Sequence, residues 1–174
     1  MVPLNMDQAK FDKGRAAELA LQKHFLNTRH AVIDLGTTPP DQNWRFPHAQ
    51  HRDGPLILPD MLVMRDGWQY YVEVKQKAPT KYGCFSVGMK NLTDARTIAE
   101  ESGTDYAFII RNTLVTAKND VDMSPWFITF PFNPDWLDPK TIQDFEKSHF
   151  IPMTAFQPLL PTLRNGPPLP SRLH

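Results

Sequence analysis

The stretch that decides the fold of this 174-residue chain is PDMLVMRDGWQYYVEVK, residues 59–75. Asp66-Gly67 separates two apolar runs, and this dipeptide favours a two-residue type I′ turn because both of its residues tolerate a positive φ. Counting outward from the turn places Asp60 directly opposite Glu73. The stretch therefore predicts an antiparallel hairpin in which two carboxylates face each other.

Side chains alternate along a strand, so the predicted hairpin has two different faces. One face carries Asp60, Glu73 and Lys75. The other face is apolar and suited to a core, and it consists of Met61, Val63, Tyr70, Val72 and Val74. Directly opposed like charges destabilise a sheet unless something compensates them. A hard divalent cation with oxygen ligands would compensate; the alternative is a solvated hairpin whose charged side chains face water.

A helix is predicted upstream of the hairpin, from about Asp7 to about Asn27. Its apolar positions recur at near-helical spacing. They are Phe11, Ala17, Leu21 and Phe25, with Leu19, Ala20 and Leu26 widening the stripe. Glu18 lies beside this stripe. Taken alone, Glu18 is either a solvent-facing acid or a third carboxylate of a site.

Three short motifs follow one another along the chain: Lys13-Gly14-x-x-x-Glu18, Pro59-Asp60 and Glu73-x-Lys75. With this order the chain resembles the PD-(D/E)xK nuclease superfamily, which includes restriction endonucleases and archaeal Holliday-junction resolvases. The resemblance covers about residues 9–112. It implies an α/β domain with a restriction-endonuclease-like central mixed β-sheet flanked by helices.

Two later segments agree with the order of elements in that superfamily. A helix is predicted from Asn91 to Ser102, with Asn91 or Thr93 as its cap and Gly103 after its end. A buried strand is predicted over the apolar run that starts at Asp105 and ends at residue 111.

The resemblance implies a metal-dependent DNA endonuclease with Glu18, Asp60, Glu73 and Lys75 as catalytic residues. Asp60 and Glu73, with the Val74 carbonyl, are expected to hold Mg2+ or Mn2+, and Glu18 to complete this shell or bind a second ion. Lys75 is expected to orient or help deprotonate the attacking water and to stabilise charge on the phosphate. Phosphodiester hydrolysis in general needs an activated water and neutralised charge, which a bound cation supplies.

Basic residues supply the candidate contacts to DNA. The chain has 19 basic and 19 acidic residues, but residues 1–93 hold 12 basic against 9 acidic, and residues 94–174 hold 7 against 10. The positive excess therefore lies in the half with the predicted site, as nucleic-acid binding favours. The candidate contacts are Lys13, Arg15, Arg45, Arg52, Lys77, Lys81 and Lys90. Alternatively, Lys77 is a solvated lysine, and Phe85 near Lys81 packs under the second helix instead of stacking on a base.

Other site types have little support in the sequence. Cys84 is the single cysteine, so no internal disulfide forms. His48 and His51 lack partner ligands at zinc spacing. No apolar run is long enough to cross a bilayer, and no signal core is present near the N-terminus, so we expect no membrane contact and a cytoplasmic setting.

The C-terminal third forms an aromatic and proline-rich extension. A strand is predicted over 126–130, a short helix over 139–147, and an extended tail over 158–174. We expect one domain over 1–157, with a core at about 9–112 and a covering segment over 113–157. A homodimer is expected, so that two sites can cut two strands. The alternative functions are a nucleic-acid-binding module or an assembly subunit that keeps the fold without turnover.

Overall fold

The computed structural model describes residues 5–36, 48–119, 122–145 and 147–159, with the side chains of 5–11 and 48 left aside. Its two α-helices are α1 (Asn5–Asn27) and α2 (Met89–Ser102). Its strands are β1 (Ala31–Asp34), β2 (His48–Ala49), β3 (Leu56–Ile57), β4 (Met61–Arg65), β5 (Trp68–Lys77), β6 (Cys84–Gly88), β7 (Asp105–Asn112), β8 (Trp126–Thr129), β9 (Gln143–Phe145), β10 (Ser148–Pro152) and β11 (Gln157–Pro158). No helix within the described ranges is both long and apolar enough to span a membrane.

The predicted hairpin forms with the predicted turn. Asp66 has φ 51° and Gly67 has φ 81°, so both turn residues are in the left-handed region that a type I′ turn requires. The strand pairs run from Arg65–Trp68 to Met61–Val72, in the register obtained by counting from the turn. The register is fixed because a slip of one residue would exchange the two faces of each strand.

The hairpin supplies two neighbouring strands of a six-stranded mixed sheet with the order β1-β4-β5-β7-β8-β11. β5 and β7 are parallel, and the other neighbours are antiparallel. This arrangement confirms the predicted mixed sheet. The parallel pair needs a crossover connection, which β6 and α2 provide.

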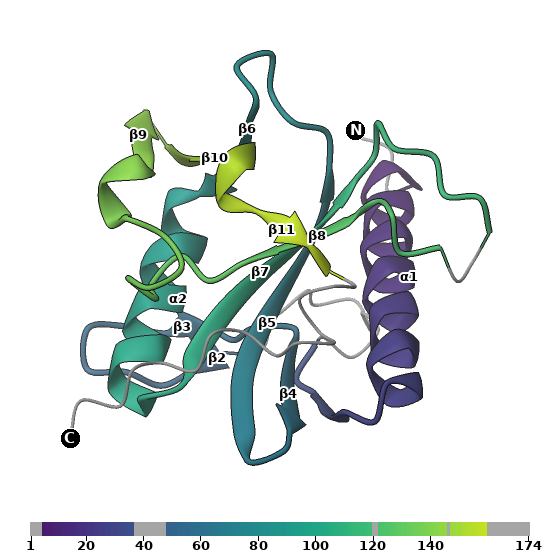
Figure 1. Ribbon diagram of the computed structural model, residues 1–174. Coiled ribbons are helices and arrows are strands. Elements are labelled where there is room, and N and C mark those ends of the chain that lie inside the picture. The colour runs from purple at the N-terminus through teal and green to yellow at the C-terminus, as the bar shows by residue number, and fades with distance from the viewer. Residues whose placement is uncertain (1–4, 37–47, 120–121, 146, 160–174) are drawn as a thin grey trace.

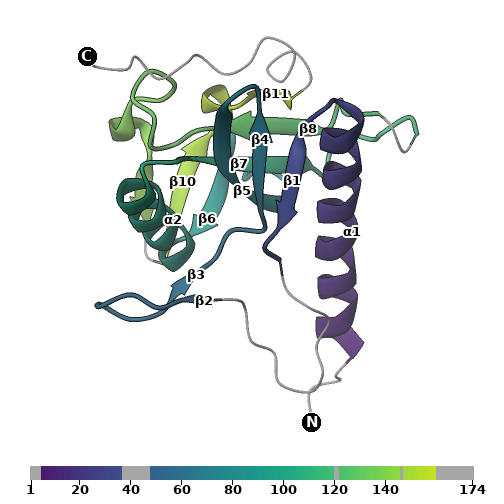
Figure 2. The same cartoon turned by 90° about the horizontal axis from the view of Figure 1, so that it is seen from below.

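The two helices lie on opposite sides of the sheet (Figures 1 and 2). On one face, α1 places Leu21 and Phe25 against Val72 and Val74 of β5. Leu21 and Phe25 are fully buried, and such a side chain contributes about 1.5–3 kcal/mol of burial free energy. The apolar stripe is narrower than predicted, because Leu19 and Leu26 are exposed.

The other face of the sheet packs against α2 and a small sheet of order β6-β10-β9. Phe108 and Ile110 of β7 lie in this second core, whereas Ala107 and Ile109 lie in the first. This double burial explains the uninterrupted apolar run of β7. α2 begins after Gly88 rather than at an Asn91 or Thr93 cap, and it ends as predicted at Gly103, where φ is 61°.

The C-terminal segment contributes strands to the six-stranded sheet and to the β6-β10-β9 sheet, and does not only cover the core. β8 pairs with β7, and β11 pairs with β8. The predicted helix over 139–147 is wrong: a 3-10 helix spans Pro139–Thr141, and β9 and β10 follow. Residues 143–145 pair with β10 as a strand, and this pairing overrides the local helical preference. Leu159 is fully buried, so the expected tail begins no earlier than residue 160, outside the described residues.

Candidate active site

Asp60 lies just before β4, where three chain segments meet. Its N–H donates to the Val72 carbonyl at 3.0 Å, and its own carbonyl accepts the Leu35 N–H at 2.9 Å. Its carboxylate oxygen Oδ2 accepts the Val74 N–H at 2.6 Å. The ladder therefore ends at Met61–Val72, and the predicted pair of Asp60 with Glu73 is not one of its rungs. The reason is that the Asp60 side chain takes a backbone donor of β5 for itself.

Glu73 and Lys75 project from β5 on the α2 side of the sheet. Glu73 is buried, with 6% of its surface exposed, and the Lys75 ammonium donates a hydrogen bond to its Oε1. Tyr106 of β7 lies close by, and burial followed by the Glu73 carboxylate raises the pKa of its hydroxyl. Tyr106 was not predicted as a site residue, because in the sequence it is one more apolar position in a buried strand.

Charges in this group influence one another strongly. Burial, followed by the negative charge of Glu73, raises the pKa of the Asp60 carboxyl well above its usual value. Burial opposes the charged form of Lys75, but the carboxylates of Glu73 and Asp60 outweigh it and raise the pKa of the ammonium. Two poorly solvated carboxyl groups thus share one ammonium.

Glu18 of α1 belongs to a neighbouring cluster with Arg15 and Asp34. Its Oε2 lies 2.7 Å from Arg15 Nη1, and Arg15 Nη2 lies 2.6 Å from Asp34 Oδ2. Glu18 nevertheless raises the pKa of Asp60 after burial and Glu73, which places it within electrostatic reach. Asp34 was not predicted. In the sequence, Asp34 is an acid at the end of a short apolar strand. This strand, β1, pairs with β4, which follows Asp60.

The residues present fit a divalent cation. Among the described residues, no group of three or more His, Cys, Asp or Glu side chains could hold a metal by itself. Mg2+ does not need such a group, because it takes one or two carboxylates and completes its shell with water and phosphate oxygens. Asp60 and Glu73 supply two carboxylates that lack a full complement of positive charge.

The predicted DNA contacts divide into paired and exposed groups. Arg15 is bound to Glu18 and Asp34, Lys77 donates to the Ser86 carbonyl, and Lys90 pairs with Asp94 at 2.8 Å. The Arg52 side chain is exposed, and its Nε lies 3.4 Å from Asp53 Oδ2. Exposed Lys13 lies on α1, and exposed Lys81 stacks over Tyr82 on the loop between β5 and β6. Arg45 falls outside the described residues.

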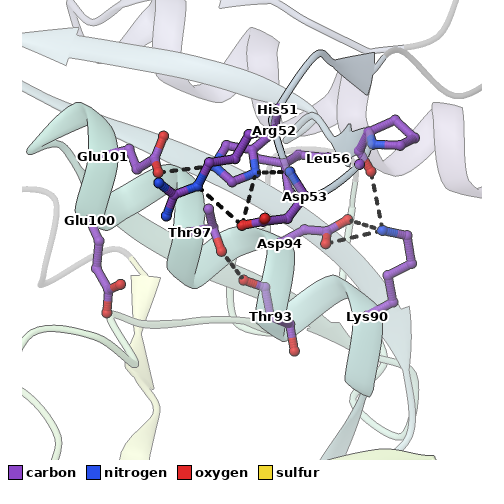
Figure 3. A pocket seen from close by; sticks show the side chains of 12 residues that line it. His51, Arg52, Asp53, Leu56, Lys90, Thr93, Asp94, Thr97, Glu100 and Glu101 are labelled. Carbon is purple, nitrogen blue, oxygen red and sulfur yellow. Dashed lines mark hydrogen bonds and ion pairs between the residues drawn. The ribbon is translucent and has the colours of Figure 1, made fainter.

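An open groove lies between the turn that joins β2 to β3 and helix α2 (Figure 3). His51 Nε2 lies 3.0 Å from Glu101 Oε1 across it. The buried carboxylate of Asp94 accepts the Ile57 N–H at 2.9 Å. This bond fixes the backbone three residues before Asp60, so α2 helps to place that carboxylate. Asp94 was not predicted, since its partner Ile57 is distant in sequence.

No protein-family model matches the sequence, and neither does any curated protein. Among solved structures, the fold is similar to that of Hjc, a Holliday junction resolvase from the archaeal hyperthermophile Archaeoglobus fulgidus. The TM-score is 0.55 at 14% sequence identity, over 87% of this chain and 96% of that chain. The likeness shows a restriction-endonuclease-like fold. This is the fold that the sequence resemblance implied.

Proposed function

We propose that this chain is a metal-dependent DNA endonuclease. The observation that supports the proposal best is the joint position of Asp60, just before β4, and of Glu73 and Lys75 on β5: two poorly solvated carboxyl groups and one ammonium. A buried pair of like charges lowers the stability of the fold, and such pairs cluster at functional sites. The resolvase-like fold supports the same conclusion.

Each residue of the group has a role in this proposal. Asp60 and Glu73, with the Val74 carbonyl, would hold Mg2+ or Mn2+, and Glu18 would add a further carboxylate. The ion, when bound, neutralises the phosphate and lowers the pKa of a bound water. The Lys75 ammonium, held on Glu73, would orient the attacking water and stabilise negative charge on the phosphate.

Exposed basic side chains would contact the DNA. Lys13 and Lys81 carry exposed ammonium groups and are the proposed contacts to the phosphate backbone. Such contacts position a substrate without reading its sequence. Because Hjc is described as a Holliday junction resolvase, a four-way junction belongs among the first substrates to test.

The proposal is tested with labelled plasmid, linear duplex, single-stranded DNA and a four-way junction, each with Mg2+, Mn2+ or EDTA. We expect cleavage that requires the metal and falls at least about a hundredfold in Asp60→Asn and Lys75→Gln. Asp66→Asn makes the same chemical change as Asp60→Asn at the exposed tip of the same hairpin and should retain activity. DNA binding in EDTA without cleavage under any condition would replace the proposal with a binding module.

A further inference from the structure

One guanidinium is the centre of the cluster beside the proposed metal site. Arg15 Nη2 lies 2.6 Å from Asp34 Oδ2, and Arg15 Nη1 lies 3.4 Å from Asp34 Oδ1. The same Nη1 lies 2.7 Å from Glu18 Oε2. Arg15 therefore holds Asp34 with two nitrogens and shares one of them with Glu18. A planar guanidinium suits this division, because its donors have a fixed geometry.

The backbone in turn fixes Asp34. Its Oδ1 accepts the Gly36 N–H at 3.0 Å, and the Leu35 N–H between them donates to the Asp60 carbonyl at 2.9 Å. Bonding to Arg15 lowers the pKa of the Asp34 carboxyl, so this group is negative at neutral pH. Asp34 thus ties Arg15 to the segment that carries Asp60.

Gly36 lets the chain close over the cluster. A Cβ at this position would lie 3.0 Å from Asp34 Oδ1, 3.1 Å from Arg15 Nη1 and 3.3 Å from Glu18 Oε2. These separations are shorter than ordinary van der Waals contact, so a side chain here would push the ends of these three side chains by a few tenths of an ångström. The close approach shows that all three charged groups lie next to the backbone of Gly36.

We propose that Asp34 is a positioning residue for the metal-binding carboxylates, and that it acts through Arg15. By anchoring the guanidinium, Asp34 limits the positive charge given to Glu18 and leaves that carboxylate able to act on a cation held by Asp60 and Glu73. Without Asp34, the whole Arg15 guanidinium pairs with Glu18. The Glu18 carboxylate is then no longer available to the cation. This inference rests on the proposed function.

Calorimetric titration of the metal-free full chain with Mn2+ tests the inference. We expect Asp34→Asn to weaken Mn2+ binding roughly three- to tenfold, and Arg15→Gln to strengthen it. The double variant should bind like Arg15→Gln alone, because Asp34 has no route to the site once Arg15 is gone. An equal weakening by Asp34→Asn in both backgrounds would show a simple through-space charge effect and overturn the inference.

Two glycines offer a second test that removes no charge. Gly36→Ala crowds the three side chains and should weaken Mn2+ binding. Gly14→Ala is the matched control, since a Cβ there meets nothing within 4 Å. Equal affinities of these two variants would contradict the inference, even if Asp34→Asn failed to fold.

Failure of the inference and failure of the proposed function give different results. If the wild type binds Mn2+ and Glu73→Gln abolishes binding, but Asp34→Asn binds as tightly as wild type, only the role of Asp34 is overturned. If the wild type binds no Mn2+, the proposed function itself is overturned.

Discussion

Asp60 combines two properties that usually exclude each other. It bonds to the backbone of the neighbouring strand, through the Val74 N–H, and it faces a second carboxylate in a poorly solvated position. The first property fixes the side chain, whereas the second destabilises its charged form. Both follow from its place just before β4, where its side chain replaces a rung of the ladder.

The raised pKa of Asp60 gives a prediction for the metal-free protein. A carboxyl whose pKa is higher in the folded than in the unfolded chain, where it is about 3.9, destabilises the fold as pH rises through that interval. In EDTA, Asp60→Asn should therefore gain stability relative to wild type as pH rises from below 4 towards neutrality. Urea unfolding of both proteins across this range provides the measurement.

Bound metal should reverse the order of stability of wild type and Asp60→Asn. A ligand at a hundred times its Kd stabilises the state that binds it by about 2.7 kcal/mol. We expect Mg2+ to raise the unfolding midpoint of wild type and to leave that of Asp60→Asn unchanged. An equal rise in both proteins would place the ion elsewhere.

At the scale of elements, α2 and β3 are joined by one buried carboxylate. Asp94 accepts the Ile57 N–H and pairs with Lys90. Asp94→Ala leaves the Ile57 N–H without this acceptor, which should cost about 1–3 kcal/mol in urea unfolding. Cleavage should also fall, because Ile57 leads to Asp60. Glu100→Ala, an exposed position on the same helix, is the control, and an equal loss in both variants would exclude the anchoring role.

The turn between α1 and β1 contains a buried histidine. His30 Nδ1 lies 3.0 Å from Thr28 Oγ1, and its ring packs on Phe25 with centroids 5.2 Å apart. Burial, and then the charge of Arg65, lower the pKa of His30. Its contribution to stability is therefore present above the unfolded value of about 6.5 and is lost as pH falls through the folded pKa.

The lowered pKa of His30 predicts how the stability of the fold changes in acid. Wild type should lose stability between pH 7 and pH 5, and His30→Gln should lose less. Some loss should remain in the variant, since burial also lowers the pKa of His24. Thermal unfolding at several pH values measures the difference. Parallel curves for the two proteins would show that His30 does not titrate in this range.

For the whole molecule, the homodimer remains a prediction. One site of this kind cuts one strand, so two cuts in a duplex or junction require two sites or two encounters. We expect light scattering after gel filtration to give twice the chain mass of 20.0 kDa. A monomeric mass, together with nicking of only one plasmid strand, would contradict the prediction.

The sequence by itself determined the hairpin and the central elements. Asp66-Gly67 set the turn, and counting from it gave the register of β4 and β5, because these effects act over a few residues. The periodicity of α1, α2 and β7 also lies within single segments. The sequence likewise singled out Asp60, Glu73 and Lys75 as a group.

Only the tertiary structure decided which other residues join that group. Arg15 meets Asp34 across 19 positions and Ile57 meets Asp94 across 37, and no local pattern contains such pairs. The predicted helix over 139–147 failed for a related reason: residues 143–145 pair with β10, and β10 in turn pairs with the distant β6. Contacts between distant segments depend on how sheets and helices pack, and this packing also fixes the pKa of Asp60.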